Sequence, residues 1–91
     1  MEGVPDDRRK RAKAALASDL PISIRIGRNG ITEELVAELS TQVAARGLVK
    51  VKLNRGLADR EERRAAFRDL ATSSGTDLLV ARGNVAIYGP A

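Results

Sequence analysis

The stretch ISIRIGRNGITEEL, residues 22–35, decides the fold of this chain. Isoleucines alternate with polar residues over positions 22–26, which predicts a strand with one buried face. The segment GRNG, residues 27–30, predicts a tight loop because glycine adopts backbone conformations that other residues avoid. Thr32 is a good N-cap residue, so a helix is expected to follow at once. The stretch therefore predicts a strand, a short basic loop and a helix in direct succession.

The glycine loop allows two interpretations. Glycine lets another chain approach closely, and a helix N-terminus presents unpaired N–H groups, so a phosphate is one candidate ligand. The alternative is a structural turn that carries a surface arginine, Arg28. Glu33 and Glu34 suit the helix dipole but would repel a phosphate placed too near. The loop by itself leaves both interpretations open.

Composition limits the classes of protein. With 91 residues the chain predicts one domain over residues 1–91, with residues 1–6 as a frayed tail. It contains neither cysteine nor histidine, which removes thiolate sites and the commonest general base and metal ligand. No apolar segment approaches the ~20 residues of a membrane span, and the N-terminus lacks a signal-peptide core. We therefore expect no catalytic residues, metal, cofactor or membrane contact, and a cytoplasmic location.

The positive charge is concentrated in the middle of the chain. The net charge is +4, and residues 22–56 carry a balance of +3, against +1 for residues 1–21 and zero for residues 57–91. Excess basic charge around a glycine loop favours nucleic acid as a partner. The alternative is that the charge serves only solubility.

Further helices and strands follow from the usual start and stop signals. A first helix is expected from Asp6 or Asp7 to about Ser18, with basic residues around a small apolar stripe; its arginines either contact phosphate or are simply solvated. The later expectations are a helix over 32–46, a strand over 49–53, a helix from the Asp59 capping box to about Ser73, and a hairpin of strands 77–82 and 85–88.

Three details of these elements can be tested. Lys50 and Lys52 alternate with valines in the second strand and should face away from the core. In the hairpin, Val80 should lie opposite Ile87, and Leu79 opposite Tyr88. In the third helix, Arg60, Arg64 and Arg68 form a row that Glu61 and Asp69 could neutralise, so a solvated face is favoured there.

The element order, α-β-α-β-α-β-β, predicts an α/β (two-layer α+β) fold with a four-stranded mixed sheet. Two crossovers make the first three strands parallel, and the fourth runs antiparallel. Three loops then leave the same end of the sheet, where open α/β sheets usually bind ligands. The polar residues expected to share this basic edge are Arg28, Asn29, Asn54, Arg55, Arg82 and Asn84. Because Phe67 and Tyr88 are the only aromatic residues, backbone and shape recognition of structured RNA suits the chain better than base stacking.

The combined pattern resembles the CRM domain (chloroplast RNA splicing and ribosome maturation), also called the YhbY-like family. The residues that carry the resemblance are IGRNGITE at 26–33, GLVKV at 47–51, Gly75, and Ile87-Tyr88. The resemblance implies an RNA-binding module similar in fold to the C-terminal domain of initiation factor three, with strand order 1-2-4-3. The chain departs from the family in the hairpin, where Asn84 and Gly89 replace basic residues and Arg82 is the basic residue available instead.

From residues and resemblance together we expect a non-enzymatic protein that binds structured ribosomal RNA or a large-subunit precursor particle. The candidate RNA-binding residues are Arg25, Gly27, Arg28, Asn29, Gly30, Lys50, Lys52, Arg55, Arg82 and Asn84. A small basic architectural protein of chromatin is the alternative, and a small enzyme such as a sulfur carrier is a third hypothesis that the missing cysteine and histidine disfavour. The sequence names neither the RNA nor any protein partner.

Overall fold

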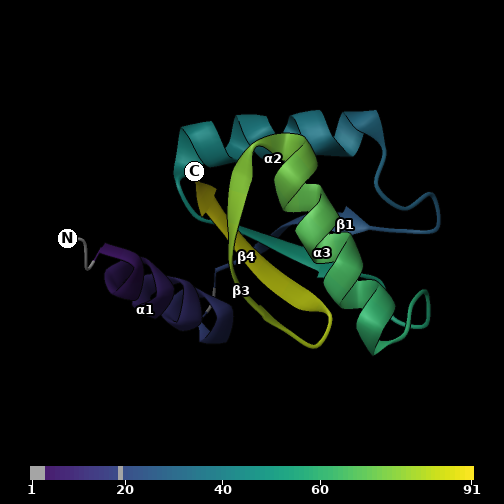
Figure 1. Cartoon of the computed structure of the whole chain (residues 1–91), viewed down its shortest axis with the longest axis horizontal. Coiled ribbons are helices and arrows are strands. Elements are labelled where there is room, and N and C mark those ends of the chain that lie inside the picture. The colour runs from purple at the N-terminus through teal and green to yellow at the C-terminus, as the bar shows by residue number, and fades with distance from the viewer. Residues whose placement is uncertain (1–3, 19) are drawn as a thin grey trace.

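The computed structural model of the protein describes residues 4–18 and 20–91 (Figure 1). Along the chain the elements are α1 (Val4–Ala17), β1 (Ile22–Ile26), α2 (Glu33–Arg46), β2 (Val49–Leu53), α3 (Arg60–Ser74), β3 (Thr76–Arg82) and β4 (Val85–Pro90). The expected order and element types are confirmed. Because α1 begins at Val4, neither Asp6 nor Asp7 lies at its N-cap position, and residues 4–6 belong to the helix rather than to a tail. Residues 1–3 of the expected tail lie outside the described residues.

The four strands form one mixed sheet in the order β1-β2-β4-β3. β1 and β2 are parallel, and β4 lies between β2 and β3 and is antiparallel to both. β1, β2 and β3 therefore point the same way, as the two crossovers predict. This sheet confirms the expected topology, and it brings the C-terminal ends of those three strands to one end of the sheet.

The two helices that follow the basic loops have well-defined ends. The Thr32 hydroxyl accepts a hydrogen bond from the Leu35 amide at 3.1 Å, which fixes the start of α2. At α3 the Asp59 carboxylate accepts from the Glu62 amide, and the Glu62 carboxylate accepts from the Asp59 amide, which completes the expected capping box. Gly75, with φ of 69°, ends α3 in the left-handed conformation that glycine tolerates best. These caps set where the loops stop.

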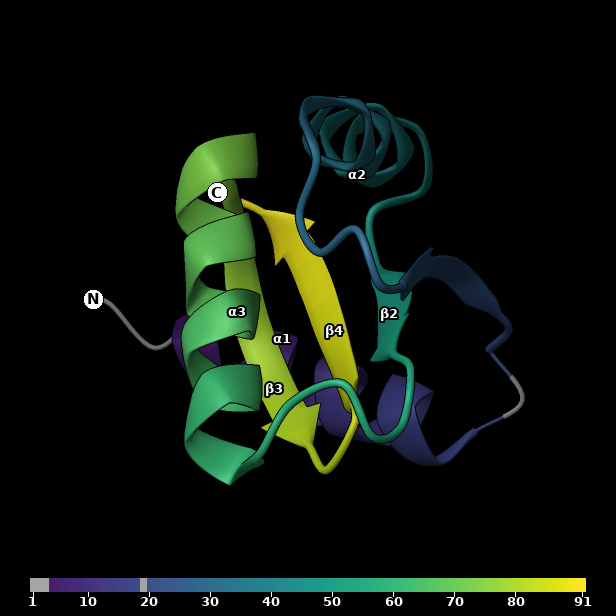
Figure 2. The same ribbon diagram turned by 90° about the vertical axis from the view of Figure 1, so that its right-hand side faces the viewer.

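The helices cover both faces of the sheet. α2 and α3 pack on one face over the main core, and α1 packs on the other face against β3 and β4 (Figure 2). Tyr88, which is fully buried, donates a 2.8 Å hydrogen bond to the Phe67 carbonyl and so joins β4 to α3. On the opposite face, Ala12 of α1 and Ile87 of β4 are also fully buried. The apolar stripe of the first helix thus covers the second face of the hairpin.

The hairpin register agrees with the prediction in one pair and differs in the other. Val80 lies opposite Ile87, as the Gly83-Asn84 turn predicts. The expected pairing of Leu79 with Tyr88 is wrong: Leu78 is the partner of Tyr88, because a bulge interrupts the register between Leu78 and Val80. A bulge sets two residues of one strand against one of its neighbour, and the turn sequence contains no sign of it.

Candidate nucleic-acid interface

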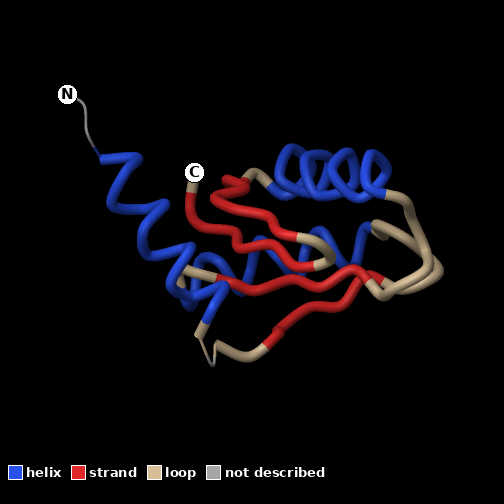
Figure 3. The backbone as a smooth tube through the Cα atoms, turned by 90° about the horizontal axis from the view of Figure 1, so that it is seen from below, coloured by secondary structure: helices blue, strands red, loops and turns tan. Residues whose placement is uncertain are grey.

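The three basic loops meet at one end of the sheet. The Asn54 amide donates to the Ile26 carbonyl at 2.9 Å, which joins the loops after β1 and β2. The Leu53 amide donates to the Asn84 carbonyl at 2.7 Å, which joins the end of β2 to the hairpin turn. Figure 3 shows the tan loops after β1 and β2 together at the right of the molecule. The expectation that Arg28, Arg55 and Arg82 share one end of the sheet is confirmed.

The glycine loop is a closed turn. The Gly30 amide donates to the Gly27 carbonyl at 3.0 Å, so Arg28 and Asn29 occupy the two central positions and are exposed. Gly30 has φ of 67°, a conformation that side chains with a Cβ rarely adopt. A shallow hollow of about 260 Å³ lies beside the turn, lined by Arg25, Arg28, Asn29 and Thr32, with Glu34 also on its wall. The loop therefore projects one cation and one amide beside a helix start.

Three cations lie in register across the sheet next to these loops. Arg25 of β1 is the partner of Lys52 of β2, Lys52 is the partner of Val85 of β4, and Val85 is the partner of Arg82 of β3. Directly opposed residues project to the same face of a sheet, and here that is the face that also carries α1. We call Arg25, Lys52 and Arg82 the cationic row.

The cationic row does not contribute to the stability of the sheet. Like charges set directly opposite on neighbouring strands destabilise a sheet. Among the side chains of residues 7–18 and 20–91, the ion pair within 4.0 Å joins Arg8 to Asp77 at 3.1 Å, so no carboxylate of these residues pairs with the row. An anionic ligand would relieve the repulsion between its members.

Lys50 differs from the other predicted site residues. It faces away from the main core, as expected, but it is only 8% exposed. Its ammonium group donates to the Leu20 carbonyl at 3.2 Å and, at 3.5 Å, to that of Ser18. Lys50 is covered because the carbonyls of Ser18 and Leu20, beyond the end of α1, lie against its ammonium group. Lys50 holds that segment in place and presents little surface to a ligand.

A wider hollow connects the loops to α3. Its volume is about 510 Å³, and its lining combines three predicted site residues, Lys52, Arg55 and Asn84, with four that were not predicted: Gly56, Arg63, Gly83 and Val85. Arg63 is half-buried, and its guanidinium donates to the Ala58 carbonyl at 3.3 Å. Arg63 could have been predicted from its position in the sequence, because α3 begins immediately after a basic loop and its first turns lie at the same end of the sheet.

The α3 arginines form the solvated face that the sequence predicts. Arg60, Arg64 and Arg68 are exposed, as expected. Neither Glu61 nor Asp69 lies within 4.0 Å of them in an ion pair, although all five residues are described. The row is therefore not neutralised by its own helix.

Beside the glycine loop lies a hollow of different character. It measures about 470 Å³, its apolar lining includes Ile26, Ile31 and Leu53, and Glu62 and Asp69 stand on its wall. Leu57, at 40% exposure, is the large hydrophobic residue that the described chain leaves most open, and it also lines this hollow. Arg28 also lines it, but two carboxylates against one cation, over an apolar floor, do not suit a phosphate.

The described residues contain neither a candidate metal site nor a candidate membrane-spanning helix. No group of three or more acidic residues there is arranged to hold a metal ion. Of the helices that the structure describes, none combines the length and the apolar character needed to cross a bilayer.

Fold and site together define a class: a small α+β domain whose parallel strand ends carry basic loops, with a cationic row beside them. The chain belongs to the CRS1 / YhbY (CRM) domain family, which matches residues 6–88. The family resemblance read from the sequence is thereby confirmed.

One protein is similar to the chain in sequence, and another is similar to it in fold. Over 62 residues the chain is 39% identical to "Probable RNA-binding protein PA4753" of Pseudomonas aeruginosa, a match that covers 68% of this chain and 58% of that protein. The chain thus aligns with less than two thirds of that relative's length. The fold is similar to the solution structure of SAV1595 from Staphylococcus aureus, described as a candidate RNA-binding protein, with a TM-score of 0.73, 17% identity, and coverage of 93% of this chain and 85% of that one.

Proposed function

We propose that this chain is a non-enzymatic RNA-binding protein of the cytoplasm that engages ribosomal RNA of the large-subunit precursor during ribosome maturation. RNA as the ligand is supported by the family and by the relative from Pseudomonas aeruginosa, whose name describes RNA binding. The ribosomal target is the part of the proposal that follows from the resemblance of the sequence to the CRM family.

The observation that carries the proposal is the position of the cationic row next to the glycine loop. Arg25 and Lys52 are register partners, Arg82 lies on the same sheet face, and Arg28 projects from the adjoining turn. Charges arranged in this way suit the spaced phosphates of an RNA backbone. Exposed aromatic side chains are missing from this surface, since Phe67 and Tyr88 are fully buried, so the contacts are to phosphate and sugar rather than stacked bases.

The sharpest test reverses the charge of the turn. Replacing Arg28 and Asn29 by aspartate should abolish RNA binding, because the new carboxylates face phosphate oxygens. The fold should survive, since both side chains are exposed and surface changes usually alter stability by less than about 0.5 kcal/mol. Binding to a large-subunit RNA fragment is measured by fluorescence anisotropy, and unfolding by circular dichroism on the same sample.

A matched control separates charge from position. Arg68→Asp with Thr72→Asp makes the same change in net charge on exposed residues of the distal half of α3. We expect the control to keep most of the RNA affinity. Equal affinity of the loop variant and the wild type would overturn the proposal, and tighter binding of duplex DNA than of structured RNA would favour an architectural chromatin protein instead.

A further inference from the structure

We propose that a further pocket, between α3 and the hairpin turn, binds a phosphodiester group of the same RNA. This α3 arginine pocket has a volume of about 230 Å³ and is lined by Arg60, Arg63, Arg64, Phe67, Ala81, Arg82 and Gly83. The proposal rests on the proposed function for the identity of the ligand, whereas the pocket itself can be tested with a simpler anion.

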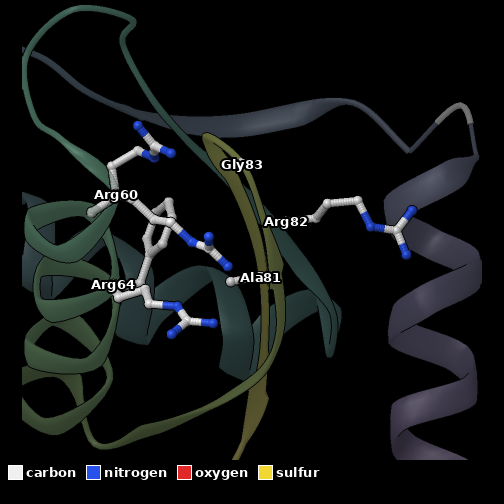
Figure 4. A pocket seen from close by; sticks show the side chains of 7 residues that line it. Arg60, Arg64, Ala81, Arg82 and Gly83 are labelled. Atoms are coloured by element: carbon white, nitrogen blue, oxygen red, sulfur yellow. The ribbon is translucent and has the colours of Figure 1, made fainter.

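The positive charge of the pocket lies on its α3 side. In Figure 4, Arg60 and Arg64 lie on the α3 side, with Ala81 and Gly83 of the hairpin facing them. Arg82 extends from the hairpin in the direction away from α3, so its guanidinium belongs to the cationic row and not to this pocket. The buried ring of Phe67 contributes to the lining, which limits access of water to one side of a bound group.

The position of these arginines works against the stability of the helix. Arg60 is the first residue of α3, where the helix dipole disfavours a cation, and Arg64 follows at a spacing that places like charges side by side. No described carboxylate forms an ion pair with Arg60, Arg63 or Arg64. Three guanidinium groups in two turns, without an acidic partner in the described chain, are what a phosphate needs for charge-assisted hydrogen bonds.

The backbone amides at the start of α3 are not the donors that bind the phosphate. The Asp59 carboxylate already accepts from the Glu62 amide, so the capping box occupies a donor that an anion at the helix end would use. The donors left for a ligand are the arginine side chains. Arg63 is held in place by its hydrogen bond to the Ala58 carbonyl, whereas Arg60 and Arg64 are exposed and free to close on a ligand.

The pocket is continuous with the loop edge. Arg63 and Gly83 line both this pocket and the hollow that contains Lys52, Arg55 and Asn84. An RNA strand that crosses the cationic row therefore reaches α3 by passing over the hairpin turn. This continuity favours a phosphodiester of the bound RNA over a free nucleotide as the occupant.

The test compares two double variants of equal charge. Arg60→Gln with Arg64→Gln removes two of the three pocket arginines of α3, and Arg46→Gln with Arg68→Gln removes two exposed arginines that line none of the hollows described above. We expect the pocket variant to lose about tenfold in affinity for the large-subunit RNA fragment, and its dependence of log affinity on log salt to become shallower by about one. The control should change both quantities much less, and equal effects of the two variants would overturn the proposal.

A titration with inorganic phosphate tests the pocket without RNA. In NMR spectra, phosphate should shift the Gly83 amide and the Arg64 side-chain Nε–H signals of the wild type, and the pocket variant should lose the Gly83 shift. If phosphate shifts these signals but the pocket variant binds RNA as tightly as the control, the occupant is a free phosphate and not RNA. If wild-type protein binds no RNA while the phosphate shifts persist, the proposed function fails and the pocket stands; if RNA binds but phosphate moves neither signal and the variants are equal, the pocket fails alone.

Discussion

Arg25 of β1 and Lys52 of β2 are direct partners in the sheet, so two cations lie side by side on one face. Opposed like charges cost a sheet a few tenths of a kcal/mol to about 1 kcal/mol. The pair therefore lowers the free energy of unfolding. Substitutions that remove these two charges should raise the free energy of unfolding and weaken RNA binding.

Replacing both members of the pair tests this opposition. Arg25→Gln with Lys52→Gln should raise the free energy of unfolding by a few tenths of a kcal/mol and weaken RNA binding. The slope of log affinity against log salt should fall by roughly 0.7–0.9 for each phosphate that the variant no longer neutralises. Urea unfolding and anisotropy titrations at several salt concentrations measure the two effects. An unchanged slope would exclude the cationic row from the RNA-binding surface.

Lys50 and Lys52, two residues apart in β2, should have opposite roles. Lys50→Met removes hydrogen bonds to the carbonyls of Leu20 and Ser18 and should lower the free energy of unfolding by about 1 kcal/mol, with little change in RNA affinity. Lys52→Met should leave stability within about 0.5 kcal/mol and weaken RNA binding. The same two assays decide the matter, and a larger loss of RNA affinity for Lys50→Met would restore Lys50 to the binding surface.

The two glycines of the loop should respond differently to alanine. Gly30 has φ of 67°, so Gly30→Ala forces a strained backbone and should cost about 1 kcal/mol even though a Cβ there meets no atom within 4 Å. A Cβ on Gly27 would lie 3.7 Å from the Asn54 side chain, an ordinary contact, so Gly27→Ala should be nearly neutral for stability. Thermal unfolding of both variants is the measurement, and equal destabilisation would contradict this account of the turn.

Tyr88 should make stability depend on pH in alkaline solution. Burial raises the pKa of the Tyr88 hydroxyl above its usual value of about 10. A folded-state pKa above the unfolded one means that the unfolded chain loses this proton first. The stability contributed by neutral Tyr88 is therefore complete below about pH 10 and is lost as the pH rises above it.

The variant Tyr88→Phe isolates this effect. Near pH 7 it should be less stable than the wild type by about 1 kcal/mol, because the 2.8 Å hydrogen bond to the Phe67 carbonyl is removed. Above pH 10 the difference should shrink, since only the wild type has a tyrosine to ionise. Urea unfolding at pH 7 and pH 10.5 measures it, with lysine titration common to both proteins. A constant difference would show that Tyr88 ionises equally in both states.

Most of the fold could be predicted because the signals are local. Alternation over 22–26 and 49–53 gives two strands with a defined buried face, and the Asp59 capping box gives the start of α3. The parallel order then follows from crossover geometry, and with it the meeting of the three loops. Local pattern and chain topology are therefore sufficient to place Arg28, Arg55 and Arg82 at one end.

What could not be predicted depends on contacts between distant segments. Lys50 alternates like a surface residue, but the backbone around Ser18 and Leu20 folds over it. The bulge near Leu79 is a property of the paired strands and leaves no local signal. The α3 arginine pocket was missed because residues 57–91 have balanced charge. The net charge of this segment does not show how its charges are placed, and no described carboxylate there forms an ion pair with Arg60 or Arg64.

The attachment of α1 has a consequence for local unfolding. Among the α1 side chains that the structure describes, Ala12 is fully buried, and the polar links to the sheet come from Arg8, which pairs with Asp77 and donates a hydrogen bond to the Pro90 carbonyl. α2 and α3, by contrast, insert Leu39, Val43, Phe67 and Leu70 into the main core. The amide hydrogens of α1 should therefore exchange with solvent through an opening that leaves the rest of the domain folded. In that open form Ile87 becomes accessible, so more of the sheet face that carries the cationic row is exposed in a minor state than in the ground state.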